Sequence, residues 1–572
     1  MMHELFLIDW PFVEWLSPAL VLILGAFLVP VFQGVVQKFV RLAVPGLALI
    51  AVLGTAPGTY GSFQFLNMEM TLGRADSLSL VFAHVFGIMA LIGAIYALHV
   101  RDNVQHMAGF IYAGSAMGAV FAGDLITLYV FWELMLLASV WLIWRNRQAA
   151  SMAAGFRYLL VHAASGVLLL AGIVLYYTQA GSLSFDAIEI GGTAFWLILI
   201  GFMVNAAVPP LHAWLTDAYP EATVTGAVFL SAFTTKTAVY TLMRGFPETE
   251  ALIWLGAVMT LWGVTYAVLA NNIRRLLAYH IVSQVGFMVA GVGLGTAMAL
   301  NGSAAHAFAH ILYKALLFMS AGAIIHMTGR MKLTELGGLY RYMPLTFIFY
   351  MIAAFSISAL PLTSGFVSKT MILEAYADQQ AALVWLMLSL ASAGTFLSVG
   401  LKLPWFAFMG HDSGLRPREA PANMLIAMGI AAFFCIYIGV RPELLYQLLP
   451  HQPVDYNAYT LAHVFWDLQL LSFVGLVFFV LLKFMAPKDK ITLDTDWFYR
   501  KASPRAVRFI HHYGTIAWRN LLTAMLWPLR QIVSQALRFH GPQGVLARTW
   551  PTGNMVLWVA VLLVTSLLLY YI

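Results

Sequence analysis

Long runs of apolar residues recur along the chain from residue 17 almost to its end. A helix that crosses the hydrocarbon core of a bilayer needs about 20 predominantly apolar residues. The runs are continuously apolar rather than alternating, which favours helices over the strands of a membrane barrel. The pattern therefore predicts an all-α polytopic membrane protein with about 14–16 transmembrane helices, among them one continuous span over 224–244.

Two of the apolar runs contain residues that interrupt a helix. The first interruption contains Asn205, Pro209 and Pro210, and the second contains Pro361, Ser364 and Gly365. Proline removes a backbone donor, and the freed backbone groups need a protein interior or a wet cavity. Paired broken helices are typical of transporters built from inverted repeats, where they mark the ion path. We therefore predict two broken helices within an inverted-repeat core.

Composition excludes several classes of protein. Hydrophobic residues make up 61% of the chain and charged residues 10%, against about 25% charged in soluble domains. A water-soluble enzyme and a disordered chain are both excluded. The single cysteine, Cys435, excludes disulfide frameworks and cysteine-ligated metal centres within this chain. No motif for a cofactor appears, so we expect neither a cofactor nor a bound metal.

The distribution of charge reflects the orientation of the spans in the membrane. Lys and Arg number 31 against 25 Asp and Glu, and the basic residues gather in short loops between spans. Most follow odd-numbered spans, such as Arg101, Arg145, Arg274 and Arg330, although Arg244 breaks the pattern. Positive residues favour the cytoplasmic side, which places the N-terminus outside. Nucleic acid is not an expected partner.

The C-terminal part differs from the rest. Residues 486–551 mix arginines and lysines with apolar residues. This mixture predicts an amphipathic lateral helix that lies on the membrane surface or along a partner subunit. A cytoplasmic linker is the alternative. The run 552–572 predicts a terminal transmembrane helix. The remaining expected regions are 1–104 with N-terminal helices, 105–410 as the core with two half-channels, and 411–485 with peripheral helices.

Three charged residues lie deep inside predicted spans, namely Glu133, Lys236 and Lys369. Ionisable groups at this depth are costly, so each is a functional candidate. A structural carboxylate held by a neighbouring helix is the alternative for Glu133, and snorkelling to the interface is the alternative for Lys236. A buried lysine can hold or release a proton according to the position of a nearby anion, so these groups could translocate protons without a cofactor.

A second polar group lies between the two breaks. His306, His310 and Lys314 are spaced at i, i+4 and i+8, which places them along one face of a helix. Two such histidines can bind zinc, but further ligands are not evident and a lysine would repel the metal. A proton relay suits the spacing better, and polar helix packing is the alternative.

At these residues the chain resembles the antiporter-like membrane subunits shared by Mrp-type Na+/H+ antiporters, respiratory NADH:quinone oxidoreductase and membrane-bound hydrogenases. The resemblance covers roughly residues 75–410. It is carried by DLITLYVFWE, PPLHAWLTDAYPEA, TTKTAVYTLMR, NNIRRLLAYHIVSQVGF, HAFAHILYKALLF and LPLTSGFVSKTMIL. Through PEATVTGAVF, TTKTAVY and LDTDWFYR the chain is most similar to the Mrp D-type subunit.

The resemblance assigns roles to particular residues. It implies that Glu133 is the glutamate of the fifth helix, Lys236 the central lysine and Lys369 the ionisable residue after the second break. It also makes the His306, His310 and Lys314 group the relay between the half-channels. The family has a lysine before the first break, where this chain has Asn205. Either Lys236 replaces that lysine as the partner of Glu133, or this subunit pumps poorly.

The function expected from the resemblance is translocation of protons and a monovalent cation, with Na+ expected, as one subunit of a multisubunit antiporter. Alternatives are a proton-pumping subunit of a redox complex, a scaffold with an impaired channel, and a membrane partner for inorganic-carbon or other uptake. The chain is not expected to be catalytic by itself except as part of a redox-driven translocase. Expected partners are other membrane subunits and the lipid bilayer, in the cell inner (plasma) membrane.

Overall fold

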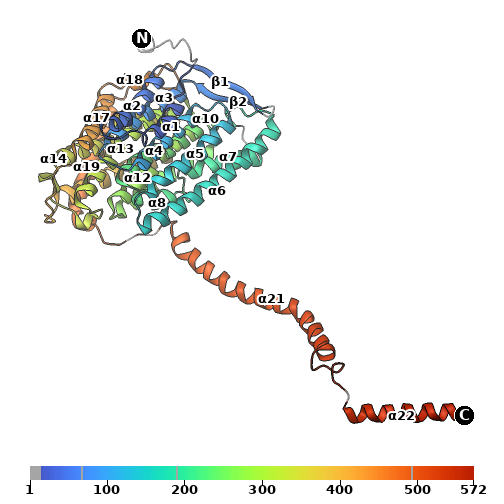
Figure 1. Ribbon diagram of the computed structural model, residues 1–572. Coiled ribbons are helices and arrows are strands. Elements are labelled where there is room, and N and C mark those ends of the chain that lie inside the picture. The colour runs from blue at the N-terminus through green and yellow to red at the C-terminus, as the bar shows by residue number, and fades with distance from the viewer. Residues whose placement is uncertain (1–14, 66–67, 189–190, 491, 493, 550) are drawn as a thin grey trace. The chain divides into compact units, whose positions relative to one another are not determined.

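The computed structural model describes residues 15–65, 68–188, 191–490, 492, 494–549 and 551–572. It divides into two compact units, residues 1–495 and 496–572. Helices dominate both units, as predicted (Figure 1). Eleven of the described helices are long and apolar enough to cross a membrane, and three more are apolar but shorter. The predicted all-α polytopic membrane fold is confirmed.

The first unit begins with α1 (Pro18–Leu28) and α2 (Gly34–Leu53). An antiparallel hairpin of β1 (Gly58–Phe65) and β2 (Met68–Ala75) follows, with Gly58 opposite Ala75. The hairpin was not predicted, because it lies between two apolar runs and its first strand is mostly exposed. The next helices are α3 (Ser77–Ala97), α4 (Asn103–Phe121), α5 (Leu125–Trp144) and α6 (Ala149–Ala180).

Both predicted broken helices are present. The first consists of α7 (Gly192–Asn205) and α8 (Ala213–Ala218), and the second of α14 (Pro344–Ile357) and α15 (Ser364–Asp378). Each break contains a non-glycine residue in the left-handed region, Ala207 at φ 58° and Ala359 at φ 59°. Such residues are uncommon and cluster at functional sites. The breaks therefore interrupt the helical hydrogen bonding of both spans.

A third interruption was not predicted. The span expected over 224–244 is divided into α9 (Val224–Ala232) and α10 (Thr234–Gly245). Phe233, between them, has φ −99° and ψ −67°. The side chain of Tyr112 on α4 bonds both the backbone N–H and the hydroxyl of Thr234, at 3.0 and 2.6 Å. This tyrosine stabilises the start of α10 in place of a helical hydrogen bond.

Two helices form the centre of the first unit. They are α12 (Ile273–Leu294) and α13 (Ala297–Thr328). The most apolar stretch of each helix is 100% and 94% buried, respectively. Asn272 caps the start of α12, since its side chain accepts from the backbone N–H groups of Arg274 and Arg275. Helix α13 packs against α12, α14, α15 and α9. Polar residues on α13 therefore lie in the protein interior.

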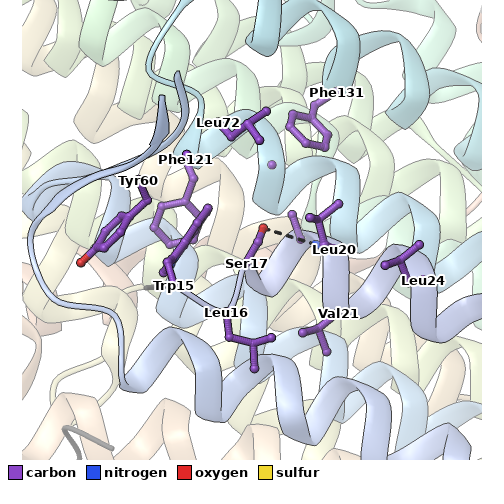
Figure 2. Close-up of a pocket in the computed structure, with 13 residues that line it drawn as sticks. Trp15, Leu16, Ser17, Leu20, Val21, Leu24, Tyr60, Leu72, Phe121 and Phe131 are labelled. Carbon is purple, nitrogen blue, oxygen red and sulfur yellow. Dashed lines mark hydrogen bonds between the residues drawn. The ribbon is translucent and has the colours of Figure 1, made fainter. Parts of the chain in front are cut away.

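The remaining helices of this unit complete its periphery. They are α11 (Glu250–Leu269), α16 (Ala382–Thr395), α17 (Ala422–Val440), α18 (Glu443–Tyr446), α19 (Leu461–Val480) and α20 (Leu482–Met485), with π-helical turns at Phe396–Lys402 and Trp405–Met409. An apolar cavity of about 560 Å³ lies beside α1, where Trp15 stacks on Tyr60 with ring centroids 5.2 Å apart (Figure 2). The described residues that line it include no carboxylate, histidine, lysine or arginine.

The segment after α20 is attached to the core by a buried carboxylate. Asp494 accepts hydrogen bonds from the His212 ring and from the Tyr279 hydroxyl, both at 2.8 Å. His212 precedes α8, so this segment contacts the first broken helix. The second unit contains α21 (Ser503–His540) and α22 (Thr552–Tyr571). Helix α21 has 38 residues and carries both basic and apolar side chains, as predicted for the amphipathic region.

Candidate functional site

Lys236 lies at the third helix interruption. Its side chain is fully buried, and its ammonium donates to the carbonyl of Ser231 at 2.6 Å. That carbonyl belongs to α9, near the point where helical hydrogen bonding stops. Snorkelling would leave the ammonium at the membrane surface, whereas here it turns inward to a backbone acceptor. The interruption therefore leaves a backbone carbonyl that accepts a hydrogen bond from the buried Lys236 ammonium.

Lys369 is arranged in the same way at the second broken helix. Its ammonium donates to the carbonyl of Ile357, the last residue of α14, at 2.8 Å and to the Ser392 hydroxyl at 3.3 Å. It also lies 5.1 Å from the centre of the Phe287 ring. Both lysines are thus bound to carbonyls next to helix breaks, an arrangement typical of transporter ion sites.

A glycine permits the close approach at the second break. A Cβ atom at Gly365 would lie 1.7 Å from the carbonyl oxygen of Ser356. The hydroxyls of Ser356 and Ser364 also bond each other at 2.9 Å across the break. Gly365 and Ser364 therefore shape the backbone near Lys369, and Pro361 lies in the same break between α14 and α15.

The predicted relay group lies on α13 between the two lysines. His306, His310 and Lys314 are all fully buried. His306 bonds the Ser368 hydroxyl at 3.1 Å, one residue before Lys369. Both ring nitrogens of His310 and the ammonium of Lys314 have no hydrogen-bond partner among the described residues. Unpaired buried polar atoms are rare, and they are expected where water or a mobile proton completes the bonding.

His310 occupies a central position in this group. Its ring is close enough for charge interaction with Lys236 on α10, Lys314 on its own helix and Lys369 on α15. Its ring centroid lies 6.2 Å from that of His306 and 5.2 Å from that of Tyr313. The structure thus brings together Lys236, Lys369 and the whole predicted relay.

A further histidine at this site was missed. His280 on α12 is fully buried, shares a hydrogen bond of 2.6 Å with the Ser398 hydroxyl, and interacts electrostatically with Lys314 and Lys369. One turn further on, the Gln284 side chain bonds the Thr395 hydroxyl at 3.3 Å. The segment NNIRRLLAYHIVSQVGF contains both His280 and Gln284, so their i, i+4 spacing was the available signal.

Glu133 on α5 lies against α6 rather than against a lysine. A Cβ atom at Gly166 would lie 1.9 Å from the Glu133 Oε1 atom, so the absence of a side chain there makes room for the carboxylate. Oε1 is buried and has no hydrogen-bond partner among the described residues. Lys236 donates to Ser231 instead.

Asn205, where the resembled family has lysine, bonds a histidine that was also missed. The Asn205 side-chain oxygen lies 2.9 Å from the His162 ring nitrogen Nδ1 on α6. His162 is one turn before Gly166, which places it on the helix face that receives Glu133. Its other ring nitrogen, Nε2, is buried without a partner among the described residues. The first half of the core therefore has a neutral amide bonded to a titratable ring, one helical turn from the glycine that faces Glu133.

The first break also has backbone partners. The Trp214 indole donates to the carbonyl of Val204 at 2.8 Å, one residue before Asn205. Pro209 and Pro210 lie between α7 and α8, as predicted, and are themselves half-buried or exposed. Together the helix interruptions, the buried lysines Lys236, Lys314 and Lys369 and the buried histidines provide groups that can bind and transfer protons.

Comparison with known proteins identifies the family. Residues 122–398, which contain almost all of these groups, match the model described as NADH:quinone oxidoreductase/Mrp antiporter, TM. The matched segment is similar to that family. The chain is a multi-pass integral membrane protein. Its Lys236, Lys369 and relay residues lie within the matched segment, whereas α19 and the C-terminal unit lie outside it.

Individual relatives are moderately similar. The chain is 28% identical to the A/B component of the probable K(+)/H(+) antiporter of Rhizobium meliloti over 66% of this chain and 41% of that protein. It is 29% identical to the D component of the Na(+)/H(+) antiporter of Alkalihalophilus pseudofirmus over 65% of this chain and 80% of that protein. The chain spans about half the length of the first curated relatives that it matches.

A solved structure has the same fold. A chain of the Mrp complex from Dietzia sp. DQ12-45-1b superimposes with a TM-score of 0.68 and 24% identity, covering 78% of this chain and 99% of that one. The relatives named above and this structure are subunits of multisubunit membrane complexes.

Proposed function

We propose that this chain translocates protons in exchange for a monovalent cation as one subunit of a multisubunit antiporter in the plasma membrane. One observation carries the proposal. Lys236 and Lys369, each bound to a carbonyl beside a helix break, are linked through His310, which interacts electrostatically with both. A proton can pass along this row by short transfers between neutral and charged groups.

The place of the row in the fold supports transport across the membrane. Lys236 lies at the interruption between α9 and α10, and Lys369 follows the break between α14 and α15. Interrupted helices are typical of the ion sites of transporters of inverted-repeat design. We expect Na+ as the exchanged cation and a D-type position in the complex, because the similar proteins include the D component of a Na(+)/H(+) antiporter.

One observation favours a scaffold role as the second candidate. Asn205, at the position where the resembled family has a lysine, bonds His162 and supplies no fixed positive charge. If the first half of the path needs a permanent cation, this chain would hold partners in place without transporting protons.

The experiment uses inverted membrane vesicles that contain the full complex. A proton gradient is generated, and its collapse on adding NaCl or KCl is followed with a pH-sensitive dye. The wild-type chain should support collapse, and Lys236→Met should reduce the rate by about 100-fold or more, the usual contribution of a general acid–base group. Cation-dependent collapse that is unchanged in Lys236→Met would refute the proposal and favour the scaffold role.

A further inference from the structure

Helix α19 carries a buried carboxylate that the path described so far does not use. Of its 20 residues, only Asp467, Leu471 and Phe478 are buried. These three define the face that packs on α16 and on the π-helical turn Phe396–Lys402. Asp467 is 5% exposed, and its Oδ2 atom has no hydrogen-bond partner among the described residues. An inward-facing carboxylate on a largely lipid-exposed helix calls for a functional explanation.

The charged side chain that interacts most strongly with the Asp467 carboxylate is Lys369. The carboxylate and the ammonium are close enough for electrostatic interaction, although neither bonds the other directly. Lys369 donates to the Ser392 hydroxyl of α16, and α16 also packs on α19. Asp467 therefore lies on a helix that packs against the surroundings of the last lysine of the proton path.

A second polar pair lies one turn closer to the surface. His463, four residues before Asp467 on the same face of α19, bonds the Glu374 carboxylate of α15 at 3.1 Å. The His463 side chain is 19% exposed and that of Glu374 38% exposed. The Tyr456 ring lies 5.9 Å from the His463 ring and interacts electrostatically with Glu374 and Asp467. Exposure thus rises step by step from Lys369 outward.

The positions along the helices agree with this order. Lys369 lies about two and a half turns before the end of α15, and Glu374 about one turn before it. His463 lies in the first turn of α19. The end of α15 and the start of α19 are on the face opposite the start of α14, which follows the basic residues Arg330 and Arg341. By the positive-inside rule this is the outer face.

We propose that Asp467 and the His463–Glu374 pair form the outer exit of the proton path. In this step an N–H bond of the Lys369 ammonium breaks as an O–H bond forms at Asp467, directly or through water. The proton then passes to the His463–Glu374 pair and to the outer aqueous phase, and uptake follows the reverse order. The proposal rests on the proposed function, since it names the group that exchanges protons with Lys369.

The test uses inverted vesicles containing the full complex and the cation-dependent collapse of a proton gradient. Asp467→Asn should lower the rate roughly tenfold or more, because the amide keeps the size of the side chain but cannot carry the proton. Asp467→Glu should retain most of the rate, which a purely structural role would not predict. Asp455→Asn, at an exposed carboxylate in the loop before α19, is the matched control and should transport normally.

A double variant that combines Lys369→Ala with Asp467→Asn distinguishes an exit role of Asp467 from general damage to the structure. Since Lys369 and Asp467 would act in one sequence of transfers, Asp467→Asn should add little to the loss caused by Lys369→Ala. Normal transport in Asp467→Asn, with Lys369→Ala inactive, would overturn the exit and leave the proposed function intact. Cation-dependent collapse that is absent in the wild type would instead refute the proposed function. Equal losses in Asp467→Asn and Asp467→Glu would also overturn the exit.

Discussion

Replacing Gly166 by alanine would place a methyl group where the Glu133 carboxylate lies. The added Cβ would be 1.9 Å from the Glu133 Oε1 atom. Ordinary contact requires at least ~3.4 Å, so the carboxylate would have to move by about 1.5 Å. Overpacking of this kind costs about 1–3 kcal/mol, and a displaced acid–base group loses its transfer geometry. We expect the transport rate of Gly166→Ala to fall roughly tenfold or more.

The assay is cation-dependent collapse of a proton gradient in inverted vesicles, normalised to the amount of complex. Gly172→Ala, on the same helix as Gly166, is the matched control, because its Cβ would lie 2.7 Å from the Ile198 side chain of α7. It should lower thermal stability in detergent while leaving the rate per complex near normal. In a Glu133→Gln background, Gly166→Ala should add no further loss. A normal rate in Gly166→Ala would refute the idea that Glu133 acts from this position.

The other predictions concern the first break and the C-terminal part. His162→Gln should keep the hydrogen bond to Asn205 and the thermal stability but slow vesicle transport. His162→Leu should also lower the free energy of unfolding by about 1–3 kcal/mol. Normal transport in His162→Gln would show that the His162–Asn205 pair has only a structural role. Asp494→Ala should make the segment 486–495 more susceptible to trypsin, since two buried donors lose their acceptor, and an unchanged cleavage rate would contradict that docking. Deleting 486–572 should release the chain from its complex on native gels, and an intact complex would contradict a role of this region in assembly.

The sequence could predict those features whose signal is local. Glu133, Lys236 and Lys369 were found because each stands alone in an apolar run, and the breaks at Pro209–Pro210 and Pro361 because proline cannot continue a helix. The i, i+4, i+8 spacing placed the relay on one face of α13. The structure brings Lys236, Lys369 and the relay together as expected, while their roles in transport remain predictions.

Features that depend on packing between distant segments could not be predicted. Nothing near Phe233 resembles a helix breaker, so the division of α9 from α10 became visible only with the Tyr112 side chain that supports it. His162 and His280 are single histidines whose partners lie on other helices. Asp467 is far from Lys369 in the sequence, and only the packing of α19 on α16 places it beside the lysine.

The central claim is that buried lysines carry the transported proton by releasing and rebinding it. Lys369→Arg tests this claim most directly, because arginine keeps the positive charge but does not release its proton in a protein. Cation-dependent proton flux should be measured in vesicles with equal amounts of assembled complex for wild type, Lys369→Arg and Lys369→Ala. The account predicts that both variants lose nearly all flux. Flux near the wild-type level in Lys369→Arg would contradict it, since a fixed charge would then be sufficient.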